Sequence, residues 1–345
     1  MAQTHYSPFT VQAGQVPSTQ TNFPVVLWPT DNRFRTVAQG GNVSNNGSGF
    51  DIRPYSDAGL TTPLTYELVP NSYVATTGQF EMHVLVPSLA DGYVIYVGYG
   101  DSALNTDGSS TGTWDSNFLG VWHLGIPATL SGEDSTSNNN DITTNQGATA
   151  LAGKLGGGAT FDGVNDQMSA TIVHGIGTGD FTISAWVNAT SIALYEGIMS
   201  FGTYAPNMAI RAASSPNNWG AYWGAERTSG FGPSTSTWYR LSMRRSGSEV
   251  TFFRDTAQES SNYTISTSIS SNAFRLGNNG DTAWFDGGLD EARMSNSYRA
   301  DSWLTTEYRN QNAPNGTFYV IGAEQTYSAG AAVPEIMNSY RQRRY

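Results

Sequence analysis

The most constraining feature of this sequence is a series of short runs of β-branched and aromatic residues, each closed by glycine, proline, asparagine or aspartate. Runs of this kind are typical of β-strands, and the residues between them are those that tight turns use. In the run at 79–87, Met82, Val84 and Val86 fall on one face, as a half-buried strand requires. Further runs in the first third of the chain lie at 23–28, 49–55, 64–70 and 93–100.

The same pattern resumes at Phe118 and continues almost to the end of the chain. The stretch WYRLSMRRSGSEVTFFRD (238–255) predicts a hairpin around Ser246–Ser248. Only residues 297–310 have helical spacing, with Leu304 and Tyr308 four residues apart. Many short strands without interleaved helices predict an all-β chain of antiparallel sandwiches.

Composition excludes several classes of function. The net charge of −11 argues against a nucleic-acid partner. The chain has no cysteine, so disulfides and thiol nucleophiles are absent. No stretch approaches the ~20 apolar residues of a membrane span, and the first fifteen residues show no secretory signal.

Changes in composition divide the chain into four parts. We expect an N-terminal arm at 1–20 and a small β domain at 21–115. The end of this domain, around 100–117, is polar and rich in Gly, Ser and Thr, and we expect it to serve as a linker. A second β domain is expected at 118–326. Residues 327–345 form a small-residue lead and a basic end, which we interpret as an assembly tail.

Several motifs of the second domain occur in an order that resembles the laminin-G-like, concanavalin-A-like jelly roll: VWHLG, GATFDGVNDQMSA, DFTISAWVNA, TWYRLSMRRSG, FDGGLDEARMS and EYRNQ. The resemblance covers roughly residues 118–325 and implies a two-sheet antiparallel sandwich, a fold common in secreted and phage adhesins. One departure is FFRDTAQ (252–258), where the family usually has a Tyr/Asp/Gly turn. The preceding region resembles a small β domain of unassigned function that often accompanies such jelly rolls.

Asp290 and Glu291 are adjacent carboxylates in the motif FDGGLDEARMS. Successive side chains of a strand point to opposite faces, whereas a retaining glycosidase needs two carboxyls about 5–5.5 Å apart on one surface. The Glu-x-Asp strand motif of the glucanase branch is also missing, so we expect no enzyme. One interpretation is structural: one carboxylate caps the edge of the sandwich, and the other pairs with Arg293 or another nearby arginine.

The other interpretation is that Asp290 helps to bind Ca²⁺, as resemblance to jelly rolls of this type implies. Calcium takes six to eight oxygen ligands, and the loop at 133–141 and the turn at Asp162-Gly163 offer such oxygens. The candidate ligands are Asp134, Asn138, Asp162 and Asp290. The four histidines have no zinc-site spacing, and we expect turn or sheet roles for His5, His83, His123 and His174.

The aromatic run NNWGAYWGAER (217–227) has two interpretations. Trp219 and Trp223 share one strand face and Tyr222 lies on the other. With Asn218 these rings could line a glycan cleft, because sugars stack on aromatic faces. Alternatively, they fill the core of the sandwich, as large aromatic side chains usually do.

The sequence leaves two classes of function. The first is a non-enzymatic structural or adhesive component of a bacteriophage virion, in the tail, a fibre or the capsid surface, with other virion subunits and a host-surface glycan as partners. The second is a bacterial surface or secreted carbohydrate-binding module. The tail is expected to order on a neighbouring subunit, and the alternative is an idle terminus. Its residues for assembly are Tyr340, Arg341, Arg343, Arg344 and Tyr345.

Overall fold

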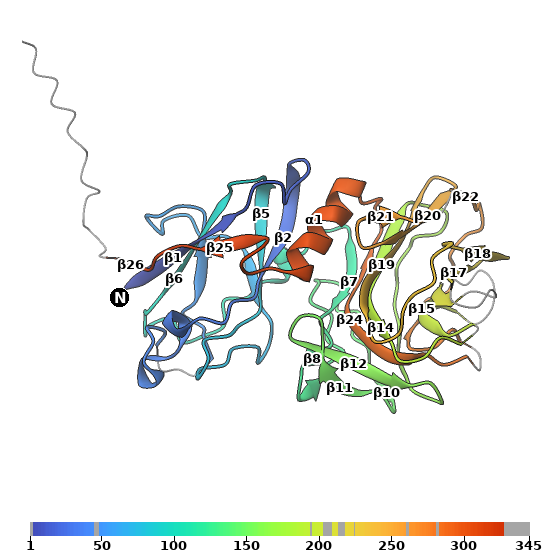
Figure 1. Cartoon of the computed structure of the whole chain (residues 1–345), viewed down its shortest axis with the longest axis horizontal. Coiled ribbons are helices and arrows are strands. Elements are labelled where there is room, and N and C mark those ends of the chain that lie inside the picture. Colours follow the sequence, from blue (N-terminus) through green and yellow to red (C-terminus); the bar gives the residue numbers. More distant parts are fainter. Residues whose placement is uncertain are drawn as a thin grey trace, which may run out of the picture.

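The structure is a computed structural model, and it describes residues 3–44, 48–193, 195–202, 209–212, 218–223, 225–259, 262–280 and 283–327. Two β domains lie side by side with a single α-helix of the described chain between them (Figure 1). The named strands pair antiparallel within each sheet, which confirms the all-β class expected from the sequence. No helix within the described residues is both long enough and apolar enough to cross a bilayer.

The N-terminal domain consists of two small sheets that face a common core. One has the strand order β25-β1-β6-β3, with β26 also paired to β1, and the other has the order β2-β5-β4. The bounds are β1 His5–Val11, β3 Arg53–Tyr55, β6 Val94–Tyr99, β25 Tyr319–Ile321 and β26 Gln325–Thr326, then β2 Gln20–Leu27, β4 Tyr66–Leu68 and β5 Met82–Leu89. Short 3-10 turns lie at Asn32–Phe34, Val37–Gln39 and Thr111–Thr113.

The boundaries of this domain differ from those expected. The predicted arm at 1–20 contains β1, which lies between β6 and β25 and buries Phe9 and Val11. Pro8 in the middle of β1 cannot donate to a ladder and hides the strand in the sequence. The chain also returns here at its far end, because β25 and β26 both pair with β1. Residues 319–326 are therefore part of the N-terminal sheet and not of the jelly roll.

The second domain is a sandwich of two large sheets. The first has the order β11-β12-β24-β14-β19-β20-β21, with β22 beside β20 and β7 beside β24, and the second has the order β10-β13-β23-β15-β16-β17-β18. The bounds of the first are β7 Phe118–Trp122, β11 Thr149–Ala152, β12 Gly157–Asp162, β14 Phe181–Ala189, β19 Trp238–Ser246, β20 Glu249–Arg254, β21 Ala257–Gln258, β22 Tyr263–Thr264 and β24 Asp286–Ser295. Those of the second are β10 Thr144–Gln146, β13 Gln167–Thr171, β15 Gly197–Phe201, β16 Ala209–Ala212, β17 Trp219–Tyr222, β18 Glu226–Thr228 and β23 Ala273–Leu276.

The core of this sandwich lies between the two sheets. Alternate residues of β14, such as Ile183, Ala185 and Val187, point into it and meet Phe274 and Leu276 of the opposite sheet. A small hairpin of β8 (Gly125–Ile126) and β9 (Thr129–Leu130) follows β7. The hairpin expected at 238–255 is confirmed as β19 and β20.

The helix α1 (Asp301–Asn312) joins the two domains and confirms the helix expected at 297–310. Leu304 is buried, and Tyr308 stacks on Trp186 with ring centroids 5.5 Å apart. Asn310 accepts a hydrogen bond from Val26 N (2.8 Å) and donates one to Val26 O (3.1 Å). Its side-chain amide thus completes the backbone pairing of β2, as a neighbouring strand would.

The predicted linker is largely exposed, but its end packs against the N-terminal domain. Trp114 is 4% exposed and belongs to the N-terminal core, together with Phe118 and Val121 of β7. Phe253 of β20 and Trp303 of α1 join the same cluster. The two domains therefore share apolar contacts, and any polar group caught between them is shielded from water.

Candidate functional site

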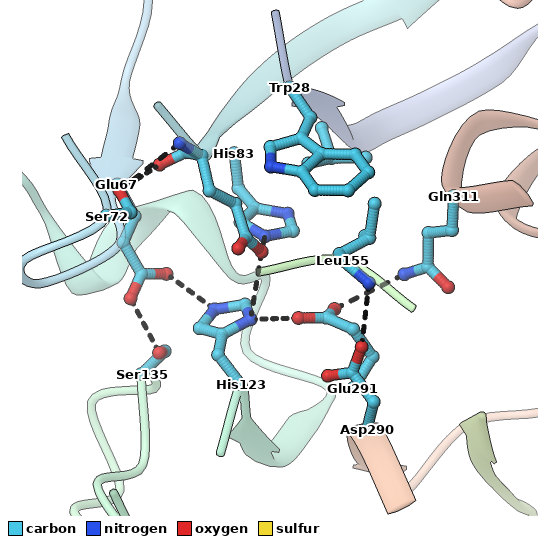
Figure 2. A network of polar contacts seen from close by, with 12 residues as sticks. Trp28, Glu67, Ser72, His83, His123, Ser135, Leu155, Asp290, Glu291 and Gln311 are labelled. Carbon is cyan, nitrogen blue, oxygen red and sulfur yellow. Dashed lines mark hydrogen bonds and ion pairs between the residues drawn. The ribbon is translucent and has the colours of Figure 1, made fainter. Parts of the chain in front are cut away.

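A group of titratable side chains is buried where the two domains meet. Glu81 directly precedes β5 and His83 lies in it, on the side of the N-terminal domain. His123 directly follows β7, and Glu291 lies in β24 of the jelly roll. One nitrogen or oxygen atom from each of these four residues lies within 4.8 Å of all the others. Figure 2 shows His83, His123 and Glu291 converging from the two domains.

Burial of this group follows from the way the domains dock. On β5, Met82, Val84 and Val86 face the N-terminal core, as expected from the sequence. Alternation places His83 on the opposite face, which a lone sheet would leave in water. The jelly roll covers that face, so His83 is also fully buried.

A β-bulge places Glu291 in this group. The pairing of β24 with β14 shifts register between Ser184 and Trp186, and Glu291 has a left-handed φ of 50°. A bulge interrupts the strict alternation of a strand. Asp290 and Glu291 are both fully buried, and their carboxyl groups lie close together in Figure 2. The expected separation onto opposite faces is therefore wrong at this point of the strand.

His123 is held between two carboxyl groups. Its Nδ1 is hydrogen-bonded to Glu291 Oε1, and its Nε2 lies 3.4 Å from Glu67 Oε2. Glu67 also accepts hydrogen bonds from Trp114 Nε1 (2.6 Å) and Ser135 Oγ (2.6 Å). The imidazole therefore has a fixed position and orientation.

The second oxygen of Glu291 faces the arginines of the jelly roll. It forms an ion pair with Arg293, as one half of the structural interpretation expects, and accepts a bond from Gln311 Nε2 (3.4 Å). The other half, a carboxylate at the edge of the sandwich, is wrong, because β24 lies between β12 and β14 and Asp290 is fully buried. Glu307 of α1 bridges Arg293 and Arg240 at 2.7 Å each. A continuous network thus runs from the strand β24 to the helix α1.

Burial controls the protonation of the carboxyl groups that lack an arginine partner. Desolvation, reinforced by the charge of Glu291, raises the pKa of Glu81 to about 8. The same two causes raise the pKa of Asp290 well above its usual range. For Glu291, burial works in the same direction, but the charges of His123 and Arg293 outweigh it and hold the pKa of the carboxyl well below its ordinary value.

The two histidines respond in opposite ways. Burial would lower the pKa of His123, but Glu291 and Glu67 raise it well above the usual value. Burial lowers the pKa of His83 far below its ordinary range, and the charge of His123, whose ring stacks on it at 4.5 Å, adds to this. At neutral pH, His123 carries the charge and His83 is neutral.

A cleft of about 600 Å³ opens beside this network, between the domains. Glu67 and His123 belong both to its wall and to the buried network. None of the described residues that line the cleft is a lysine or an arginine. Other lining residues are Val69, Asn71, Ser109, Leu124, Leu130, Glu133, Asn139 and Asp141.

The structure corrects the glycan site expected at 218–223. Trp219 and Trp223 are only 3% and 2% exposed and lie in the jelly-roll core, so a sugar cannot stack on them. Asn218 and Tyr222 are half-buried and do not line the cleft. The core interpretation of the two tryptophans is the one the structure supports.

The four expected calcium ligands do not form a common site. Asp134 accepts four hydrogen bonds from the N–H and hydroxyl groups around its own loop, and the amide of Asn138 donates to a backbone carbonyl. Asp162 caps an exposed turn, while Asp290 is buried and accepts from Leu155 N (2.8 Å). Among the described residues, Glu81, His83, His123 and Glu291 are the only group of three or more His, Asp or Glu side chains close enough to share an ion. The five residues expected in the assembly tail lie outside the described residues.

The structure thus defines a two-domain all-β protein whose second domain is a two-sheet jelly roll. Residues 161–304 match the model of the concanavalin A-like lectin/glucanases superfamily, which confirms the resemblance of this domain. A search of curated proteins by sequence gave no match.

Several solved structures are similar to parts of this chain at low identity. Domain 4 of AbnA, an extracellular arabinanase from Geobacillus stearothermophilus solved with arabinotriose, is 16% identical with a TM-score of 0.41, over 55% of this chain and 97% of that one. The binding domain of Paraclostridial Mosquitocidal Protein 1 is 12% identical (TM-score 0.44), over 56% and 52% of the two chains. Trypanosoma rangeli sialidase is 12% identical (TM-score 0.44), over 72% of this chain and 44% of the sialidase. At these values the likeness carries no argument about function.

Proposed function

We propose that this protein is a non-enzymatic adhesive component of a bacteriophage virion and that it binds glycans in the cleft between its two domains. The observation that carries the proposal is the cleft itself. It is large enough for a sugar unit and lies in the range of sizes that small-molecule sites have.

The lining of the cleft suits a ligand rich in hydroxyl groups. Asn71, Asn139 and Glu133 are exposed there and offer amide and carboxylate groups for hydrogen bonds. Ile126 and Leu130, which are half-buried, supply apolar surface for the C–H face of a sugar ring. Polar groups that fix orientation, set among apolar residues, are the usual composition of a binding site.

The proposal includes no hydrolysis, and the hydrogen bonds of the cleft carboxyl groups support this. A glycosidase needs one carboxyl to give a proton and a second to act as base or nucleophile beside the bond that breaks. Glu67, Glu133, Asp134 and Asp141 line the cleft, and burial raises the pKa of Asp134. Glu67 and Asp134 each already accept several hydrogen bonds from the protein. Glu81 and Asp290, whose pKa values are raised, are buried and do not line the cleft.

The composition of the chain and its basic tail support the virion assignment. The acidic, cysteine-free chain and its match to a superfamily of lectins fit a surface protein, and the basic tail fits a contact with a neighbouring subunit. Calcium binding by the jelly roll stays a prediction.

Binding in the cleft is tested with a glycan array, followed by calorimetry on the best sugar. Asn71 has a left-handed φ of 62°, so Asn71→Gly removes the amide without backbone strain. Combined with Glu133→Ala, it should weaken binding about tenfold or more, which is ~1.4 kcal/mol.

Asn218→Ala is the matched control, because it removes an amide at the site expected from the sequence, outside the cleft. It should leave affinity unchanged, and the sugar should be recovered intact. Equal losses of affinity in the cleft variant and in Asn218→Ala would contradict the cleft as the binding site. Release of reducing sugar would contradict the non-enzymatic assignment.

The virion role is tested by mass spectrometry of purified particles and by deleting residues 334–345. We expect the full chain in the particles and a loss of incorporation for the truncated chain. Recovery of the protein only at the bacterial surface or in the culture medium would favour the alternative, a secreted carbohydrate-binding module. Normal incorporation of the truncated chain would show the tail to be idle.

A further inference from the structure

The buried group of Glu81, His83, His123 and Glu291 has the composition of a metal site. Two imidazoles and two carboxylates present ligand atoms within 4.8 Å of one another, and all four residues are 6% exposed or less. Glu81 Oε1 lies 3.2 Å from His83 Nε2 and 3.9 Å from His123 Nδ1. Ligands that each lie about 2.0–2.2 Å from one metal ion are separated by distances of this order.

The groups behind these side chains orient two of them for coordination. Histidines that bind metals almost always donate their other ring N–H to a carboxylate, carbonyl or water. His123 directs Nδ1 into the group, and its Nε2 faces the carboxylate of Glu67 at 3.4 Å. The oxygen of Glu291 that faces away from the group is held by Arg293 and Gln311.

The charges of the group also favour a cation. Glu81 and Glu291 bring two carboxyl groups into a buried region, and Arg293 compensates only the oxygen of Glu291 that faces away from the group. Within the described chain no lysine or arginine lies at salt-bridge distance from Glu81, whose polar neighbours in the group are the two imidazoles. A divalent ion would neutralise both carboxylates and leave both histidines neutral.

We infer that Glu81, His83, His123 and Glu291 bind one divalent transition-metal ion of the Zn²⁺ class, which cross-links the two domains. Nitrogen and oxygen donors without sulfur suit Zn²⁺, whereas Ca²⁺ prefers six to eight oxygens. Four buried protein ligands make a closed, structural site. Of the four ligands only His123 belongs to the wall of the cleft, because Glu81, His83 and Glu291 do not line it.

The test uses the full chain, freed of metal with a chelator and titrated with Co²⁺ as a spectroscopic probe. We expect one equivalent of Co²⁺ with the visible absorption of a four-coordinate ion, displacement of Co²⁺ by Zn²⁺ but not by Ca²⁺, and a higher melting temperature with Zn²⁺. His83→Ala should weaken binding at least a hundredfold. Glu67→Gln keeps all four ligands and should weaken it about 10–100-fold.

His5→Ala is the control for adventitious binding, because this half-buried histidine lies in β1, outside the group. It should leave the titration unchanged. Absence of stoichiometric Co²⁺ binding in the wild-type chain would overturn the inference, as would equal affinity in His83→Ala. Should His83→Ala fail to fold, X-ray absorption of the Zn²⁺-loaded wild type decides: two imidazole ligands support the site and an oxygen-only shell refutes it.

Discussion

Glu196 lies directly before β15 and is 6% exposed, although most glutamates stay at the surface. Burial raises its pKa to about 7 from an ordinary value of 4.5, and the charge of Asp286 adds to the shift. The folded state therefore resists ionisation of this group, whereas the unfolded chain ionises freely. Between about pH 4.5 and pH 7 the contribution of Glu196 to the free energy of unfolding falls as pH rises.

Glu196→Gln should remove this dependence. We expect urea denaturation to show little difference between the variant and the wild type near pH 4.5, and a more stable variant at pH 8. Glu133→Gln, on an exposed glutamate, serves as the control and should follow the wild type at every pH. Parallel stability profiles for Glu196→Gln and wild type would rule out a raised pKa.

At the residue scale, the sequence predicts which side chains of a regular strand face the core. It does not predict which polar side chains come together in a site. The alternation that places Met82 and Val84 in the core is a local property of the strand, and the structure confirms it. By the same alternation His83 falls on the face of the strand that a lone sheet exposes to solvent. The domain that covers this face lies in a later part of the sequence. Trp219 and Trp223 were ambiguous for a related reason: an aromatic ring suits both a core and a sugar site.

At the scale of elements, Glu307 anchors α1 to the jelly roll. Its carboxylate, 5% exposed, bridges Arg240 and Arg293, which are 1% and 3% exposed. Removing one partner of a buried ion pair leaves the other charge uncompensated and costs about 3–5 kcal/mol. Glu307→Gln should lower the free energy of unfolding by that amount in urea denaturation.

Asp301→Asn is the matched comparison on the same helix. Asp301 pairs with Arg244, but its side chain is 70% exposed, so solvent screens the pair and the expected loss is about 0–1 kcal/mol. Similar losses in the two variants would mean that burial does not determine the strength of these pairs.

The elements that the sequence predicted are those with clear periodicity, including β5, the β19–β20 hairpin and α1. Two features could not be predicted from the sequence, the strand β1 and the bulge at Glu291. Pro8 masks β1, whose place is fixed by partners at both ends of the chain. The bulge at Glu291 depends on which residues of β14 lie opposite, and one strand read alone does not show this.

At the scale of the whole molecule, the two domains should unfold together. Trp303 of α1 packs on Phe23 of the N-terminal domain, with ring centroids 4.7 Å apart, and Phe118 and Phe253 lie in the same cluster. Trp303→Ala should cost about 3–5 kcal/mol because it removes a buried ring.

Calorimetry should show one transition for the wild type and one, at lower temperature, for this variant. Two separated transitions, of which the substitution moves one alone, would show that the shared apolar contacts do not couple the domains.

The cleft and the proposed metal site could not be predicted from the sequence, because both exist only between docked domains. Glu81 and His83 lie in one domain, and His123 and Glu291 lie far along the chain in the other. No spacing rule joins residues so distant. The resemblance to the superfamily predicts the sandwich fold of the second domain. It does not predict how the N-terminal domain docks on that sandwich.

The pairing of β25 and β26 with β1 also sets an order of events during synthesis. Domains usually fold from the N-terminus as the chain leaves the ribosome. Here the first sheet lacks its last edge until residues 319–326 emerge, after the whole jelly roll. The jelly roll can close first, while β1 waits with one side unpaired, so a ribosome that stalls late would release a finished second domain beside an incomplete first one.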